Sequence, residues 1–286
     1  MKYLITGANG QLGSEWVDYL SAEGIAFEAF GSTEMDVTSL ESVKHKIKSI
    51  QPEVVINCAA YTNVDEAESQ PEKAFAINEK GVKNLIAACE EYGCKLVHYS
   101  TDYVFSGDRD DEVLYPDGYP EDAQKSPVNE YGRSKREGEK ALEQSDIDFL
   151  LIRVSWLCGA FGNNFVKTML KLSEKMEEVP VVEDQIGSPT FTFDVIEKSI
   201  ELIDKECCGT YHVSSEGKLS WADFAEEAYS QTKSNTRVKR ISSDEFPTKA
   251  VRPAFSLLSV HKIEKEGLVP LDWKSGLSVL LKKLNG

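Results

Sequence analysis

Short apolar segments alternate with longer amphipathic segments over the first half of the chain. Apolar runs bounded by glycine, proline or polar residues predict buried strands, and apolar positions three or four apart predict helices. Strands are predicted over residues 3–5, 26–30, 54–57, 96–100 and 149–154, with helices over residues 11–23, 43–50, 71–92 and 129–144. This repeated alternation predicts an α/β fold: a doubly wound, Rossmann-like parallel sheet with helices on both faces.

Two features interrupt the alternation and indicate how the chain is divided. Residues 107–127 carry seven acidic side chains among prolines and glycines, which predicts an exposed loop. After Cys158 the alternation loosens, although residues 209–213 still predict a strand. We therefore expect a dinucleotide-binding domain over residues 1–156 with a returning part around 190–215. A smaller, interleaved substrate-binding domain is expected over residues 157–189 and 216–286.

A glycine-rich turn joins the first predicted strand to the first predicted helix. Gly7, Gly10 and Gly13 have the spacing GxxGxxG, which lets the backbone approach phosphate oxygens and lets the helix pack close to the sheet. The helix N-terminus at this place suits the pyrophosphate of a dinucleotide. The second strand ends at Phe30 with neither a carboxylate nor an arginine in residues 31–33, so NADH and NADPH both remain open. Asp36 with Val37 is either the adenine contact or the boundary of the next helix.

A tyrosine and a lysine lie one helical turn apart, at Tyr131 and Lys135. A phenol is a weak acid near pH 7, and a neighbouring ammonium makes proton transfer easier because it stabilises the phenolate. Thr101 ends the fourth predicted strand, at the sheet edge where ligands bind in this architecture. The three side chains therefore form a candidate catalytic set for reducing a carbonyl group.

Composition excludes several classes of partner. The chain has 48 acidic and 32 basic residues and a net charge of −16, which disfavours nucleic acid and anionic membrane surfaces. No apolar stretch approaches the ~20 residues of a membrane span. The N-terminus leads directly into a strand and leaves no room for a signal peptide. The six scattered cysteines fit free thiols in a cytoplasmic protein, and the spacing of the histidines predicts no metal site.

The chain resembles the dTDP-4-dehydrorhamnose reductases, members of the extended short-chain dehydrogenase/reductase family. The resemblance extends over nearly the whole length and is carried by residues 6–13, 57–68, 100–105, 129–135, 153–157, 162–169 and 184–190. It implies reduction of the 4-keto group of dTDP-4-dehydro-L-rhamnose by NADPH or NADH, for polysaccharide precursor synthesis. Tyr131 would be the proton donor, Thr101 would orient the carbonyl, and Lys135 would assist Tyr131.

The resemblance also implies a set of binding residues. The cofactor-binding residues would be Gly7, Gly10, Gln11, Leu12, Gly13, Asp36, Val37, Ala59, Ala60, Tyr61, Thr62, Tyr99, Tyr131 and Lys135. The substrate, a dTDP-linked keto sugar, would contact Thr101, Asp102, Tyr103, Trp156, Asn164 and Arg252. The family further suggests a divalent ion, usually Mg²⁺, whose ligands the sequence does not identify.

Two other interpretations remain open at this stage. The same residues could serve a related nucleotide-sugar reductase, an epimerase or a dehydratase. Alternatively, the chain could be a regulatory subunit that binds a dinucleotide without catalysis. The sequence fits a monomer or a homodimer equally well, and it does not identify the polysaccharide that would receive the product.

Overall fold

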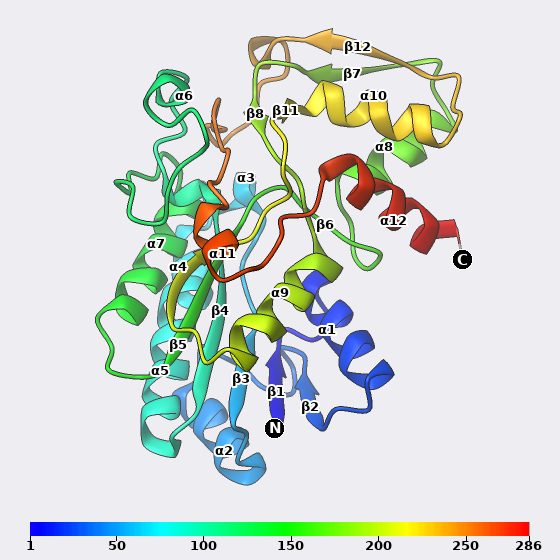
Figure 1. The fold of residues 1–286 in the computed structure, drawn as a ribbon. Coiled ribbons are helices and arrows are strands. Elements are labelled where there is room, and N and C mark those ends of the chain that lie inside the picture. Colours follow the sequence, from blue (N-terminus) through cyan, green and yellow to red (C-terminus); the bar gives the residue numbers. More distant parts are fainter. Residues whose placement is uncertain (286) are drawn as a thin grey trace.

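The computed structural model describes residues 1–285, which form a large α/β domain and a smaller lobe beside one edge of it (Figure 1). The strands are β1 (Tyr3–Thr6), β2 (Phe27–Phe30), β3 (Val54–Asn57), β4 (Lys95–Thr101), β5 (Phe149–Val154), β6 (Leu157–Cys158), β7 (Glu178–Val182), β8 (Ile186–Gly187), β9 (Thr190–Phe191), β10 (Gly209–His212), β11 (Leu219–Ser220) and β12 (Arg237–Ile241). The helices are α1 (Gln11–Ala22), α2 (Leu40–Ile50), α3 (Val64–Ala67), α4 (Pro71–Phe75), α5 (Gly81–Tyr92), α6 (Asp111–Leu114), α7 (Glu130–Glu143), α8 (Phe165–Ser173), α9 (Thr192–Asp204), α10 (Trp221–Gln231), α11 (His261–Lys265) and α12 (Trp273–Asn285). Three short turns of other helical types complete the elements: η1 (Ala76–Lys80), η2 (Asp102–Val104) and η3 (Ser243–Glu245).

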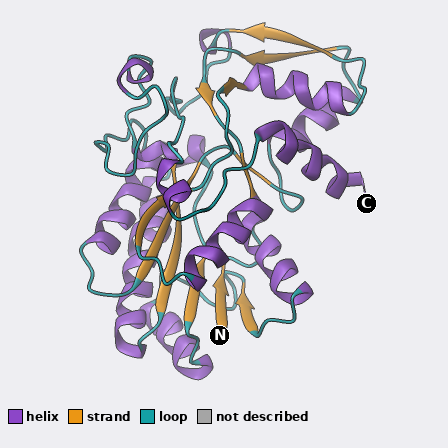
Figure 2. Ribbon diagram, viewed as in Figure 1, coloured by secondary structure: helices purple, strands orange, loops and turns teal. Residues whose placement is uncertain are grey.

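The large domain is built on a six-stranded sheet with the order β10-β5-β4-β3-β1-β2, in which every pair is parallel. Helices cover both of its faces, as Figure 2 shows. One apolar core joins α1, α9 and α11 to the sheet through residues such as Trp16, Val195 and Ile263. A second core joins α2, α5 and α7 to the opposite face through residues such as Val43, Leu85 and Leu142. The doubly wound fold predicted from the alternation is confirmed.

Individual elements agree with the predictions to within a few residues at their ends. The strand over residues 54–57 and the strand over residues 149–154 have the predicted bounds. The helix predicted over residues 71–92 is instead three consecutive segments, because the central residues Ala76–Lys80 adopt π-helical geometry. Such a wide turn inside a helix is often found at functional sites.

The smaller lobe packs against the carboxyl edge of the sheet. It holds α8, α10 and α12 together with the parallel pair β7–β12 (Figure 1). The strand predicted over residues 209–213 is β10, which returns from this part of the chain to pair with β5 at the edge of the main sheet. Within residues 1–285, none of the helices is both long enough and apolar enough to cross a membrane.

The loop over residues 107–127, which was predicted to be exposed, contains buried residues. Tyr119 is only 1% exposed and its ring stacks on Phe105 with a centroid separation of 4.4 Å. Its hydroxyl donates to Asp111 at 2.6 Å and accepts from the Gly107 amide at 3.1 Å. The acidic composition concealed this anchor because one buried aromatic residue in a polar segment has no periodicity to reveal it.

Candidate active site

The predicted site residues gather at the carboxyl edge of the sheet, where the smaller lobe begins. The glycine turn follows β1, residues 58–62 follow β3, and Thr101 ends β4. The first turn of α7 lies beside the end of β4, and its N-terminus is capped by Asn129, which accepts from the Gly132 amide at 2.8 Å. Parallel strands bring their carboxyl ends to one edge, so positions distant in sequence meet here.

The glycine turn has a geometry that side chains would disturb. Gly7 has a φ of +63°, and a Cβ atom there would lie 2.6 Å from the Ala59 amide nitrogen. A Cβ on Gly13 would lie 2.2 Å from the Gly7 carbonyl oxygen. The α1 helix begins after Gly10 without a side-chain cap and without acidic residues in its first turn. Its N-terminal amides therefore remain available to an anion such as a pyrophosphate.

Tyr131 and Thr101 meet at the end of β4. The Thr101 hydroxyl lies near the Tyr131 phenol and donates to Asp102 Oδ1 at 2.8 Å. Burial raises the pKa of Tyr131 above its usual range, and the nearby Thr101 hydroxyl offsets part of that rise. The Tyr103 ring packs edge-on against the Tyr131 ring at a centroid distance of 5.5 Å. The phenol is therefore buried and protonated in the protein without ligands.

Lys135 points toward the same strand from the next turn of α7. Its Nζ donates to the Tyr99 carbonyl at 2.6 Å and lies 3.4 Å from His98 Nε2. Burial lowers the pKa of Lys135 to about 8, against smaller opposing effects of Glu139 and Cys58. The Tyr99 phenol itself lies in the core and contacts Trp16 Nε1 at 3.0 Å.

An asparagine that the sequence analysis did not single out joins the cofactor loop to the catalytic helix. Asn78 lies in the π-helical turn η1 and is 1% exposed. Its amide accepts from the Tyr61 amide at 2.9 Å and donates to the Tyr61 carbonyl at 3.0 Å and to Ser134 Oγ at 2.9 Å. The amphipathic pattern of residues 71–92 concealed this role, because an asparagine inside a helical period has no distinguishing mark.

A carboxylate lies close to the end of β2 in the folded chain. Glu34 folds back so that its Oε2 accepts from the Gly31 amide at 3.1 Å, directly after the strand. Asp36 is exposed and accepts from the amide and hydroxyl of Thr38. Val37 is buried, and its carbonyl accepts from Asn84 at 2.8 Å. Residues 31–33 carry no carboxylate, but the turn after β2 brings the Glu34 carboxylate back to the Gly31 amide.

Asp102 lies at the border between the catalytic trio and the smaller lobe. It is 3% exposed, and its Oδ2 has no hydrogen-bond partner within the described residues. Burial raises the pKa of Asp102 to about 7, although the hydrogen bond from Thr101 favours the carboxylate. An unpaired buried oxygen is costly, so this atom is suited to a ligand hydroxyl.

The three remaining predicted substrate residues already have partners inside the protein. Trp156 has a φ of +46° and stacks on Trp221 with a centroid distance of 3.6 Å. Asn164 caps α8 and donates to Gln11 Oε1 at 2.8 Å. Arg252 is half-buried, and its Nη2 donates to Asp65 Oδ2 at 2.7 Å. A substrate that uses these side chains would have to share or replace those contacts.

The divalent ion that the resemblance suggests does not fit the residues present. Within residues 1–285, no three His, Cys, Asp or Glu side chains gather as metal ligands.

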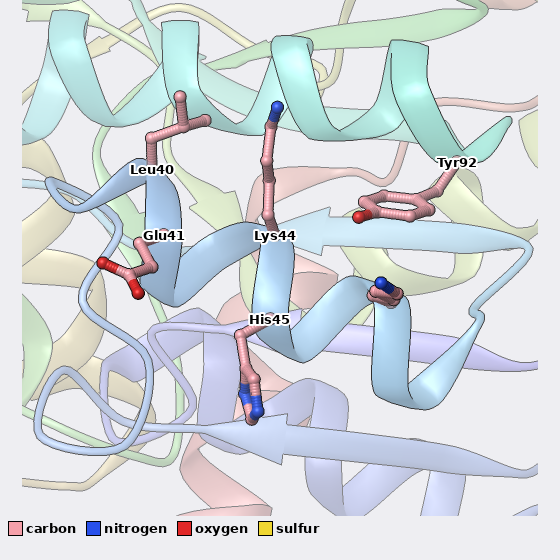
Figure 3. Close-up of a pocket in the computed structure, with 6 residues that line it drawn as sticks. Leu40, Glu41, Lys44, His45 and Tyr92 are labelled. Atoms are coloured by element: carbon pink, nitrogen blue, oxygen red, sulfur yellow. The ribbon is translucent and has the colours of Figure 1, made fainter.

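A surface hollow elsewhere on the large domain is separate from this site. It lies between α2 and α5 and is lined by Leu40, Glu41, Lys44, His45, Lys48 and Tyr92, five of which are labelled in Figure 3. Lys44 is paired with Glu91 at 2.5 Å. None of the predicted catalytic or binding residues lines this hollow, so it does not change the location of the site.

Comparison with known proteins shows the family. Residues 1–285 match the model described as the RmlD substrate binding domain. The spore coat polysaccharide biosynthesis protein SpsK of Bacillus subtilis is 39% identical, with 99% of this chain and 97% of that protein covered. A dTDP-4-dehydrorhamnose reductase of Aggregatibacter actinomycetemcomitans is 38% identical, covering 96% and 97%. The dTDP-4-dehydrorhamnose reductase of Bacillus anthracis, solved in complex with NADP, superposes with a TM-score of 0.94 at 39% identity and 99% coverage of both chains.

These full-length similarities agree with the geometry of the site. The same chain carries the glycine turn, the Thr101–Tyr131 contact and Lys135 at one sheet edge. The chain belongs to the dTDP-4-dehydrorhamnose reductase family.

Proposed function

We propose that the protein reduces the 4-keto group of dTDP-4-dehydro-L-rhamnose to a hydroxyl group, forming dTDP-L-rhamnose with NADH or NADPH as reductant. The observation that carries this proposal is the convergence of Thr101, Tyr131 and Lys135 at the end of β4. The names of the full-length relatives support the choice of substrate. A bound nicotinamide cofactor supplies the hydride that reaches C4 of the sugar.

Tyr131 supplies the proton that completes the reduction. As hydride adds to C4, negative charge develops on the carbonyl oxygen, and the phenol donates its proton to that oxygen. Thr101 lies beside the phenol and can turn its own hydroxyl from Asp102 toward the carbonyl. The two hydroxyls together would orient the carbonyl group of the sugar.

Lys135 lowers the free energy of the phenolate that remains on Tyr131 after proton transfer. Its pKa of about 8 leaves most of the side chain as ammonium at pH 7, and a positive charge one helical turn away stabilises the phenolate. The Tyr99 carbonyl fixes the direction of the ammonium. The same donors are available to ribose hydroxyl groups of a bound cofactor.

Residues on the substrate side of the site would recognise the sugar nucleotide. Asp102 Oδ2 is free to accept from a sugar hydroxyl. Arg252 has the planar donor fork that suits diphosphate oxygens, with Asp65 as its partner until substrate binds. Trp156, whose indole donates to Ser256 Oγ at 3.1 Å, and Asn164, whose amide donates to Gln11 at 2.8 Å, both follow β5 in the chain and are the other two proposed substrate contacts.

Glu34 bears on the choice of cofactor. A carboxylate at the end of the second strand of this fold accepts from the ribose 2′-hydroxyl of NADH and repels the 2′-phosphate of NADPH. Glu34 is held at that place by the Gly31 amide. We infer that both cofactors are accepted and that Glu34 favours NADH; the related enzyme solved with NADP shows that the family can hold the phosphate.

The division of the chain and its location follow as part of the proposal. Residues 1–156 with 190–215 would bind the dinucleotide, and residues 157–189 and 216–286 would bind the sugar nucleotide. The acidic composition, the free cysteines and the nucleotide-linked substrate fit a cytoplasmic enzyme.

The experiment is a panel of dTDP-, UDP- and GDP-linked 4-keto sugars, each assayed at 340 nm with NADH and with NADPH. Stoichiometric cofactor oxidation with the dTDP-4-keto-6-deoxy-L-mannose substrate, and much slower oxidation with the others, is expected. An epimerase or dehydratase would convert its substrate without net cofactor consumption. A regulatory subunit would bind the dinucleotide and turn over none of the sugars, and either result would refute the proposal.

A further inference from the structure

A chain of buried polar side chains lies behind Lys135 and connects three strands of the sheet. Thr6 on β1, Asn57 on β3 and His98 on β4 are each no more than 2% exposed. Thr6 Oγ1 donates to Asn57 Oδ1 at 2.6 Å, and Asn57 Nδ2 contacts His98 Nδ1 at 2.9 Å. His98 Nε2 then faces Lys135 Nζ at 3.4 Å. The proposed function uses none of the first three side chains.

The hydrogen bonds of Asn57 fix which way its amide points. The Ala59 backbone amide donates to Asn57 Oδ1 at 3.2 Å, and a backbone N–H can only donate. The oxygen therefore points to Ala59 and Thr6, and the NH₂ group points to His98. Because the NH₂ group donates, His98 Nδ1 must be the unprotonated nitrogen.

The tautomer of His98 follows from that orientation. Burial lowers the pKa of His98 well below its usual range, and Lys135 acts in the same direction, so the ring is neutral. A neutral ring with an accepting Nδ1 carries its single proton on Nε2. The nitrogen that faces Lys135 is therefore a donor.

The N–H donor of His98 changes the equilibrium between the ammonium and the amine form of Lys135. In the ammonium form, Nζ has only donors, so the His98 N–H and the Lys135 N–H groups oppose each other. In the amine form, the lone pair on Nζ accepts from His98 Nε2 while an N–H still donates to the Tyr99 carbonyl. The amine form satisfies both contacts, whereas the ammonium form satisfies one.

We propose that Asn57 and His98 are positioning residues that present an N–H donor to Lys135 and so make this lysine give up its proton close to neutral pH. The other groups that face Lys135 act differently. Glu139 on the same helix favours the ammonium form but is bonded to Arg153 at 2.8 Å. Burial raises the pKa of the Cys58 thiol, which keeps it uncharged. His98 on β4 is therefore the neighbour whose tautomer decides the hydrogen bonding of Nζ.

The consequence concerns how the proton of Tyr131 is replaced after each reduction. A permanently charged lysine would stabilise the phenolate but would be a poor proton source. A lysine that loses its proton readily can return one to Tyr131 and then be reprotonated from solvent. The inference rests on the proposed function for this kinetic consequence only, because the tautomer and the ionisation of Lys135 can be measured without substrate.

The test is the substitution Asn57→Asp, which reverses the tautomer. One oxygen of the introduced carboxylate can still accept from Thr6 and Ala59, and the other would accept from His98 Nδ1, which must then carry the proton. His98 Nε2 becomes an acceptor for the ammonium, so the Lys135 pKa should rise by at least about one unit. Asn235→Asp, at an exposed position of the smaller lobe, is the matched control for the added charge.

Two spectroscopic measurements on the full chain, with and without NADH, determine the tautomer of His98 and the pKa of Lys135. Nitrogen-15 spectra of the imidazole rings should show His98 protonated on Nε2 in the original protein and on Nδ1 in Asn57→Asp, with the exposed His45 and His261 unchanged as references. Titration of the Lys135 side chain by carbon-13 NMR should show the higher pKa in Asn57→Asp and no change in Asn235→Asp.

The pH profile of turnover adds a functional readout. The alkaline loss of kcat should move upward by about one pH unit in Asn57→Asp and stay in place in Asn235→Asp. A proton on His98 Nδ1 in the original protein would overturn the inference, and that result needs no variant to fold. An unchanged Lys135 titration in a folded Asn57→Asp protein would also overturn it. If the protein reduced none of the keto sugars, both spectroscopic results would still stand, so the two proposals fail separately.

Discussion

The two sides of the site are held in different ways. On the cofactor side, the backbone makes the site: the turn from Gly7 to Gly13 has no room for side chains, and the amides at the start of α1 are free of caps. On the substrate side, the predicted residues are paired with other residues of the protein, such as Arg252 with Asp65 and Trp156 with Trp221. The first side is ready for its ligand, whereas the second must exchange contacts within the protein for contacts with the sugar nucleotide.

This difference has an energetic consequence. A preformed backbone site loses little conformational freedom when it binds, so cofactor affinity should tolerate changes to nearby side chains. Where the binding residues are already paired with other residues of the protein, the binding free energy reflects only the difference between the new contacts and those that are lost. Substitutions on the substrate side should therefore change KM through their partners as well as through the residue itself.

The largest expected effect comes from Tyr131→Phe. Loss of the proton donor should lower kcat by about 10²–10⁴-fold, while NADH affinity stays within about twofold because the backbone holds the cofactor. Steady-state assays at 340 nm and fluorescence titration of NADH measure the two quantities. Tyr92→Phe, on α5 away from the sheet edge, serves as the control and should be fully active. Normal turnover by folded Tyr131→Phe would remove Tyr131 from the mechanism.

Arg252 and Asp65 test whether the substrate side exchanges contacts. Arg252→Met should raise KM for the dTDP sugar by about 10- to 100-fold, because a charge-assisted bond to the diphosphate is lost. Asp65→Asn frees Arg252, so KM should stay equal or fall. Arg237→Met, whose side chain is largely exposed on β12, is the control. If both site variants lost thermal stability equally and neither changed KM, the pair would be purely structural and the comparison between the two sides would weaken.

Asp102 lies between the two sides and should make stability depend on pH. Its pKa is raised from 3.8 to about 7, so the folded state holds a proton that the unfolded state releases. The stability this provides is present below pH 3.8 and is lost as pH rises toward 7. Asp102→Asn removes the dependence and should be more stable than the original protein by roughly 2–4 kcal/mol at pH 8, with little difference near pH 4. Thermal unfolding at several pH values measures this, and parallel curves for the two proteins would contradict it.

Glu34 gives the smallest expected effect, on the cofactor side. Glu34→Gln removes a negative charge near the expected position of the ribose 2′-oxygen but keeps a hydrogen-bonding group. The ratio of kcat/KM for NADPH to that for NADH should rise by about 3- to 10-fold, mainly through KM. The exposed carboxylate Glu28, nearby on β2, gives the matched Glu28→Gln control. An unchanged ratio would mean that Glu34 only closes the turn at Gly31.

Much of this arrangement could be predicted from the sequence. The strands of the sheet are short apolar runs with glycine or polar ends, so their positions follow from local pattern. The glycine turn and the Tyr131–Lys135 spacing are also local, and each is recognisable within a few residues. The contacts of Tyr119 and Asn78 were missed because their partners lie outside the local pattern of each segment. The hydrogen bond of Glu34 to Gly31 was missed because only residues 31–33 were considered.

The sequence by itself determined the order of strands and helices up to β5, the presence of a glycine turn after β1 and the identity of the three candidate catalytic residues. These are properties of periodicity and spacing, which survive without knowledge of long-range contacts. Only the tertiary structure decided the ionisation of Tyr131 and Lys135, since burial and neighbours such as Asp102 and Glu139 set their proton affinity. It also decided that Arg252 meets Asp65 from 187 residues away, a pairing that chain folding alone creates.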